Sequence, residues 1–222
     1  MIEALMSGDI KLAIAQLLLT LPIVFLSLSV HETAHGFIAY KLGDPTARNL
    51  GRLTLNPIKH LDLFGTLCMV LFGFGWAKPV PINTRYFKKP KRDMALTGIA
   101  GPISNLLLAV SFALVLKLVA TVAVFIPASA FVDELFSWTV LFLQLGIQLN
   151  VTLMVFNLIP IPPLDGSRLL FAVLPTKAYF KVMQYERYIY IAFLVLLALG
   201  AFDVPISLIS NLVEWVIYKA IL

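Results

Sequence analysis

Long apolar segments constrain the fold of this chain more than any other feature. A helix that spans a lipid bilayer needs about 20 mostly apolar residues. Segments of this kind lie at about 10–40, 95–125, 136–159, 187–202 and 205–222. Only 13% of the residues are charged, whereas about a quarter are charged in soluble domains. We therefore expect an all-α integral membrane protein embedded in the lipid bilayer.

The domain organisation predicted from these segments is simple. We expect a single domain over residues 1–222, with a core at about 10–175 and two C-terminal helices at about 187–222. The net charge of +5 does not indicate nucleic-acid binding, because the basic residues gather in a few connectors, as they do in the cytoplasmic loops of membrane proteins. The first apolar segment has no basic stretch before it, so we expect it to be retained rather than removed as a signal peptide.

A shorter apolar run at 63–76 is either a sixth span or a re-entrant segment, so about five to six membrane helices are expected. Three glycines weaken a helix in this run, namely Gly65, Gly73 and Gly75. The loops on either side, 41–60 and 77–93, are rich in Lys and Arg, and such loops stay on the cytoplasmic face. The run at 63–76 is therefore expected not to cross the membrane.

The segment WAKPVPIN, at 76–83, is predicted to be extended. Pro79 and Pro81 each disfavour helix at the residue before them. Together with the sequence LTL at 53–55, they predict possible short strands near the membrane surface, between the first and second full spans.

Titratable residues interrupt the first apolar segment in the sequence SLSVHETAHGF, at 27–37. Ionisable groups inside a membrane are costly and mark functional sites. On a helix, His31 and His35 lie about 40° apart around the axis and about 6 Å apart along it, so both rings can reach one metal ion. Glu32 can face that ion without binding it. This HExxH pattern predicts a zinc site in which Glu32 handles the proton of a water molecule; the alternative is a buried polar cluster satisfied by neighbouring helices.

A catalytic zinc ion takes three protein ligands, so a third ligand is expected elsewhere in the chain. Asp165 lies in NLIPIPPLDG, at 157–166, where three prolines interrupt the apolar segment at 136–159. Irregular backbone at membrane depth is tolerated where it is buried in protein or faces a water-filled cavity. Alone, this sequence is typical of a turn after a helix. Beside HExxH, we interpret Asp165 as the third ligand.

The ligands can meet only if the spans that carry them run in the same direction. The two histidines lie late in the first span, and Asp165 follows the end of the span at 136–159. An odd number of crossings must separate these two spans, so 95–125 crosses and 63–76 does not. The remaining histidine, His60, is expected to be structural and not a ligand.

Two other classes of function place similar residues in a membrane. A metal transporter also has His, Glu and Asp in its spans, but it is expected to show several metal sites along a path and repeated halves. A catalytically inactive scaffold that binds transmembrane helices would have no need for Glu32. Neither an internal repeat nor a second cluster is present in the sequence.

The motifs together resemble the site-2 protease family of intramembrane zinc metalloproteases, and the resemblance runs from about residue 25 to 175. The matching pieces are HETAH at 31–35, GPISN at 101–105 and NLIPIPPLDG at 157–166. The sequences GRLTLNPIKH and FGWAKPVPIN are similar to the compact bacterial branch, without PDZ or CBS domains. The resemblance implies a zinc-dependent metalloendopeptidase with one Zn²⁺ ion held by His31, His35 and Asp165, and with Glu32 as the general base.

The resemblance also implies regulated intramembrane proteolysis in a bacterial plasma membrane. The basic loops and the late position of the ligands in their spans predict that the active site lies towards the cytoplasmic side. Its substrates would be transmembrane proteins or leftover signal peptides, and no residue pattern selects one substrate or an oligomeric state. Asn105 is implied to bind the substrate carbonyl or the oxyanion, and a hydrogen bond between helices is an equal alternative. Asn157, and less clearly Asn150, are implied to lie beside the metal ligands or to contact substrate.

Overall fold

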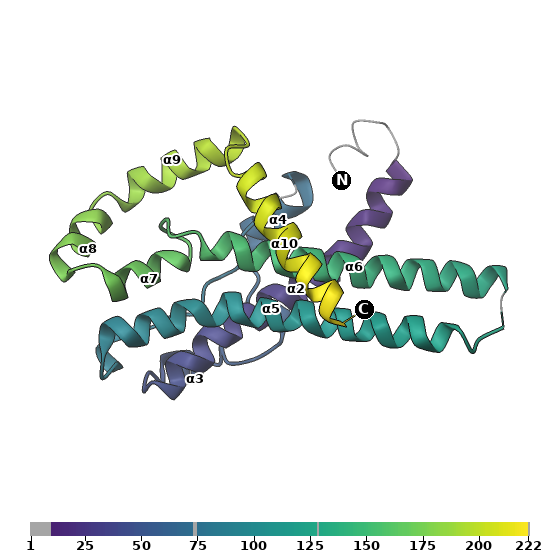
Figure 1. The fold of residues 1–222 in the computed structure, drawn as a ribbon. Coiled ribbons are helices and arrows are strands. Elements are labelled where there is room, and N and C mark those ends of the chain that lie inside the picture. The colour runs from purple at the N-terminus through teal and green to yellow at the C-terminus, as the bar shows by residue number, and fades with distance from the viewer. Residues whose placement is uncertain (1–9, 73–74, 128, 222) are drawn as a thin grey trace.

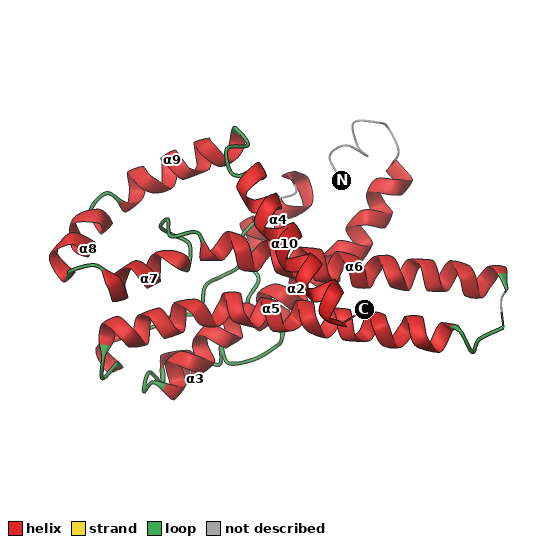
Figure 2. Ribbon diagram, in the orientation of Figure 1, coloured by secondary structure: helices red, strands yellow, loops and turns green. Residues whose placement is uncertain are grey.

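The structure is a computed structural model that describes residues 10–72, 75–127 and 129–221, and its regular elements are helices (Figures 1 and 2). Within this part of the chain, four helices are long and apolar enough to cross a membrane by length and composition. They are α2 (Ile10–Lys41), α5 (Pro90–Ala123), α6 (Ala130–Leu158) and α10 (Asp203–Ile221). They coincide with four of the predicted spans, and the all-α membrane fold is confirmed.

The span predicted at about 187–202 is a shorter helix, α9 (Glu186–Ala198), which has 13 residues. At 1.5 Å per residue it is about 20 Å long, less than the hydrocarbon core of about 30 Å. The helix ends at Ala198, and Gly200 follows in a turn with a φ of 73°, in the left-handed region. Because the apolar sequence continues through this turn, composition alone suggested a longer span. Two further helices precede it, α7 (Gly166–Val173) and α8 (Thr176–Met183).

The core of the bundle is formed by α2, α5, α6 and α10. The helices α5 and α6 lie side by side and run in opposite directions, and α2 crosses them (Figure 1). Their contact surfaces contribute the buried apolar residues Ile23, Ala109, Phe112, Ala113, Leu116, Leu143, Ile147, Val151, Met154, Val155 and Ile217. Large apolar side chains such as Leu107, Leu118 and Leu212 are more than half exposed, as the lipid-facing side of a membrane helix requires.

The apolar run that contains α4 (Leu63–Phe72) returns to the place where it starts. The helix has 10 residues and is about 15 Å long, about half the hydrocarbon thickness. Leu61 and Ala77, on either side of the run, form an isolated antiparallel bridge. The backbone N–H of Lys78 donates to the carbonyl of His60 at 2.8 Å. The two ends of the run therefore lie together, as a segment that does not cross the membrane requires.

Among the residues that the structure describes, 53–55 form no strand, and 76–83 contribute only Ala77 to the isolated bridge. Pro79 and Pro81 have no N–H to donate to a ladder. Two single turns of 3-10 helix, Pro57–Lys59 and Thr84–Tyr86, also interrupt the extended backbone. Between the first two spans, the described residues therefore form the short helices α3 (Thr46–Asn49) and α4, joined by loops and turns, and α3 and the turn at Pro57–Lys59 contact α2.

The directions of the helices bring the candidate ligands together. In Figure 1, α2 and α6 run towards the same end of the bundle, and α5 runs the opposite way. His31 and His35 lie in the second half of α2, and Asp165 follows α6 at the start of α7. The parallel arrangement predicted from the ligand positions is therefore present.

Candidate metal centre

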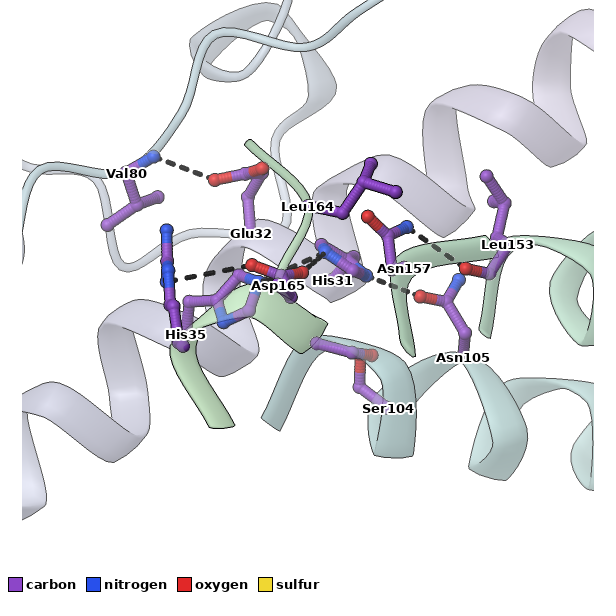
Figure 3. A network of polar contacts seen from close by, with 12 residues as sticks. His31, Glu32, His35, Val80, Ser104, Asn105, Leu153, Asn157, Leu164 and Asp165 are labelled. Atoms are coloured by element: carbon purple, nitrogen blue, oxygen red, sulfur yellow. Dashed lines mark hydrogen bonds and ion pairs between the residues drawn. The ribbon is translucent and has the colours of Figure 1, made fainter. Parts of the chain in front are cut away.

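Three buried side chains meet between α2 and the start of α7. The Nε2 atoms of His31 and His35 lie 3.0 Å apart, and each lies 3.0 Å from Oδ2 of Asp165 (Figure 3). The three residues are between 3% and 7% exposed. Among the described residues, these three form the group whose ligand atoms are close enough to hold one metal ion.

The outer nitrogens of both histidines face hydrogen-bond acceptors. Nδ1 of His35 lies 2.6 Å from the carbonyl oxygen of Thr97, and Nδ1 of His31 lies 2.5 Å from Oδ1 of Asn105. Each ring therefore carries its proton on Nδ1, which leaves a lone pair on Nε2. Two lone pairs and a carboxylate oxygen then converge with no proton between them. Such a set fits a cation, and two imidazoles with one carboxylate are ligands that zinc takes in catalytic sites.

Gly101 of α5 leaves the space in which the two rings meet. A Cβ atom at this position would come within 2.6 Å of His31 Nε2 and closer still to His35 Nε2. Thr97, Gly101 and Asn105 are four residues apart, so they share one face of α5. That face carries the two acceptors for the histidine Nδ1–H groups, with the gap at Gly101 between them.

Asp165 is brought to the histidines by a tight approach of the chain to the end of α6. A Cβ atom at Gly166 would clash with the carbonyl groups of Leu158 and Ile159, so glycine is required after the aspartate. The Arg168 guanidinium lies 3.6 Å from Oδ1 of Asp165, and this positive charge favours the ionised carboxylate that a metal ligand must be.

Glu32 lies on the neighbouring face of α2 and points to the loop at 77–83 (Figure 3). Its Oε2 atom accepts a hydrogen bond of 2.7 Å from the backbone N–H of Val80. The same loop is fixed further along, where the N–H of Asn83 donates to Oδ2 of the fully buried Asp44 at 2.6 Å. The loop therefore holds the carboxylate of Glu32 beside the metal ligands rather than among them.

The structure also places the other residues that the sequence analysis considered. Asn105 is fully buried, and its amide bonds to His31 on one side and to Asn150 on the other, which favours the interhelical alternative over contact with substrate. Asn157 is half-buried near the end of α6, and its amide N–H donates to the carbonyl of Leu153 at 3.0 Å. His60 is buried with its Nε2 2.7 Å from the carbonyl of Thr54 and lies outside the ligand group.

Three contributors to the site were not assigned from the sequence. The Thr97 carbonyl and the Val80 N–H are backbone groups, which carry no signal in the sequence. Gly101 could have been found, because GPISN places it one helical turn before Asn105. A glycine is needed there only because α5 approaches the histidine rings of α2 so closely, and the sequence does not show how close two helices lie.

A membrane bundle that encloses two histidines and an aspartate, with a glutamate between the histidines, defines a membrane-embedded, metal-dependent hydrolase. Comparison with known proteins identifies the particular group. The profile of Peptidase family M50 matches residues 19–199, and the chain belongs to this family, the site-2 proteases.

Individual relatives agree with this assignment. The chain is 47% identical over 175 residues to YwhC of Bacillus subtilis (strain 168), which is named as a candidate zinc metalloprotease. This match covers 78% of this chain and 77% of the relative. It is 37% identical over 147 residues to a candidate zinc metalloprotease, Rip2, of Mycolicibacterium smegmatis, and that match covers 64% of this chain and 51% of the relative. No solved structure matches. The protein is an integral membrane zinc metalloprotease.

Proposed function

We propose that this protein hydrolyses peptide bonds in or near the transmembrane segments of other membrane proteins, as in regulated intramembrane proteolysis. His31, His35 and Asp165 hold the zinc ion, and Glu32 is the general base. The observation that supports this proposal is the meeting of three ligand atoms, 3.0 Å apart, among helices long enough to span a membrane.

The proposed chemistry divides between the ion and Glu32. A zinc ion held by these ligands would supply a Lewis acid that could polarise a scissile carbonyl and lower the pKa of a water molecule. Glu32 takes the proton of the attacking water on a carboxylate oxygen and later gives it to the nitrogen of the leaving amine. The water oxygen bonds to the carbonyl carbon, and the C–N bond breaks as the amine receives that proton.

The loop at 77–83 is proposed to hold the unwound substrate as an added strand, with α4 beside it. The N–H groups of Lys78 and Val80 are already bonded to His60 and Glu32, and Pro79 and Pro81 have none. Arg52 already donates to the carbonyls of Lys78 and Pro79. A substrate strand would therefore donate its own N–H groups to other carbonyls of this loop. Asn157, at the edge of the site, is proposed as a further contact to the substrate backbone.

The proposed orientation places the metal centre towards the cytoplasmic side of a bacterial plasma membrane. The connector at 126–135 carries only acidic charges, whereas the connectors at 41–60, 77–93 and 160–187 carry most of the basic residues. In Figure 1 the acidic connector lies at the end of the bundle opposite to α3 (Thr46–Asn49), α7 and α8. Basic loops are retained in the cytoplasm. Residues 1–222 are proposed to form one domain, because Ile217 of α10 packs into the core of α5 and α6.

The function can be tested with the purified protein in liposomes that contain a synthetic transmembrane peptide. We expect cleavage of the peptide, loss of cleavage after treatment with a chelator, and recovery when zinc is added back. Zinc flux across the liposome without cleavage would show a transporter instead. Binding of the peptide without cleavage would show an inactive scaffold.

A second prediction concerns the hydrogen bond between Val80 and Glu32. The change Val80→Pro removes the N–H donor, and we expect kcat for the transmembrane peptide to fall about 10- to 100-fold, because a hydrogen bond to a charged group contributes about 1.5–3 kcal/mol. Zinc content should be unchanged, because the Val80 N–H bonds to Glu32, and Glu32 is not a proposed zinc ligand. Steady-state cleavage and metal analysis measure both effects.

The matched control is Val80→Ala, which shortens the buried side chain but keeps the N–H group. We expect Val80→Ala to retain most of the activity. Equal losses in the two variants would show that the packing of Val80 matters and that its N–H does not.

A further inference from the structure

A chain of three hydrogen bonds runs from the backbone of α6 to the proposed zinc ligand His31. Nδ2 of Asn150 donates to the carbonyl of Gly146 at 2.8 Å. Nδ2 of Asn105, on α5, donates to Oδ1 of Asn150 at 2.9 Å. Oδ1 of Asn105 then lies 2.5 Å from Nδ1 of His31. Both asparagines are fully buried, so no solvent competes for these bonds.

The direction of every bond in this chain is fixed at its far end. A backbone carbonyl can only accept, so the amide nitrogen of Asn150 must face Gly146 and its oxygen must face Asn105. The amide nitrogen of Asn105 must meet that oxygen, which leaves the oxygen of Asn105 for His31. His31 must therefore carry its proton on Nδ1. The opposite tautomer would set two acceptors against each other inside the protein, which is costly.

This fixed tautomer determines what His31 presents to the metal. With the proton on Nδ1, the lone pair of Nε2 faces His35 Nε2 and Asp165 Oδ2, each at 3.0 Å. With the proton on Nε2, an N–H group would occupy the place of the ion. Asn105 alone cannot fix this choice, because an amide can rotate by 180° and present its NH₂ group to His31. Asn150 prevents that rotation by accepting from Nδ2.

We propose that Asn150 is a positioning residue, which acts through Asn105 to hold His31 in the tautomer that binds zinc. The inference rests on the proposed role of His31 as a ligand. It differs from a purely structural role of the Asn105–Asn150 pair, in which the pair only joins α5 to α6. A structural pair would change the stability of the fold but not the intrinsic affinity of the folded protein for zinc.

The test is a double-mutant cycle on the zinc affinity of the full chain in detergent, measured by competition with a chromophoric chelator. In Asn150→Ser the hydroxyl can still bond to the carbonyl four residues earlier, as Ser27 does with Ile23 in α2, but it is too short to reach Asn105. We expect zinc affinity to fall about 10-fold in Asn150→Ser and about 10- to 100-fold in Asn105→Ala, the range found for partners of metal ligands. The double variant should match Asn105→Ala, because Asn150 has no other route to the ligand.

Three further variants keep the outcome clear. Thr139→Val removes a hydroxyl of the same helix that also donates to the carbonyl four residues earlier, and it should leave zinc affinity unchanged. Asn150→Leu repeats the test with a side chain of similar size if Asn150→Ser does not fold. His31→Ala should lose zinc; if it binds zinc normally, the ligand assignment itself is wrong, whatever the asparagines do.

Two results would overturn the inference while the ligand assignment stands. The first is wild-type zinc affinity in both Asn150 variants. The second is a double variant whose loss equals the product of the two single losses, because independent effects multiply and effects along one chain of bonds do not.

Discussion

Replacing Glu32 by glutamine is expected to lower kcat for a transmembrane peptide by about 10²- to 10⁴-fold, the usual contribution of a general acid–base group. The amide oxygen of glutamine can still accept the hydrogen bond that Glu32 accepts from the Val80 N–H at 2.7 Å, so the loop at 77–83 should stay in place. Glutamine cannot take a proton at neutral pH. The variant therefore separates proton transfer from the arrangement of the site.

The same variant should keep its zinc, because Glu32 is not among the three atoms that converge. Metal analysis of the purified Glu32→Gln protein and a cleavage assay in liposomes measure the two effects together. Glu134→Gln, which removes an exposed carboxylate near the start of α6, is the control for the change of charge and should be fully active. Loss of zinc from Glu32→Gln, or cleavage at the wild-type rate, would contradict the proposed role.

The sequence was sufficient to predict the membrane fold because the bilayer imposes simple requirements. Segments long enough to cross it must be apolar, and this identified α2, α5, α6 and α10. The requirement that His31, His35 and Asp165 meet determined the relative direction of α2 and α6 and excluded a crossing at 63–76. The length of α9 was overestimated, because an apolar turn around Gly200 has the same composition as the helix that it ends.

The convergence of the three candidate ligands was predictable for a similar reason. Metal ligands must be particular side chains at particular spacings, and few titratable residues lie in the spans. What supports those ligands was harder to predict, because it depends on contacts between helices. The Thr97 carbonyl and the Val80 N–H are backbone groups, and almost any residue at those positions would provide them, so the sequence does not mark them. The sequence left Asn105 open to two interpretations, and only the fold shows that its amide faces both His31 and Asn150, which favours the hydrogen bond between helices.

Gly101 provides the strongest test of the metal centre that leaves all the proposed ligands unchanged. We expect Gly101→Ala to lower zinc affinity by at least about 100-fold, more than the loss of an outer hydrogen bond to a ligand usually costs. The added methyl group would lie within 2.6 Å of His31 Nε2 and closer still to His35 Nε2, so at least one ring must move away. Chelator competition on the purified protein measures the affinity, and cleavage should fall with it.

The stability of α5 distinguishes a specific loss of zinc in Gly101→Ala from a general loss of structure. Alanine is favoured over glycine in a helix by about 1 kcal/mol, so α5 itself should be strengthened by the change. Gly146→Ala is the matched control: its methyl group would crowd the Phe112 ring at 2.8 Å in another tight crossing, but the backbone carbonyl that accepts from Asn150 is kept, so zinc should stay bound. If Gly101→Ala binds zinc as tightly as Gly146→Ala does, the two histidines do not hold the ion in the arrangement described. If Gly101→Ala loses zinc and Gly146→Ala keeps it, the gap opened by Gly101 is as necessary for the metal site as the ligands themselves.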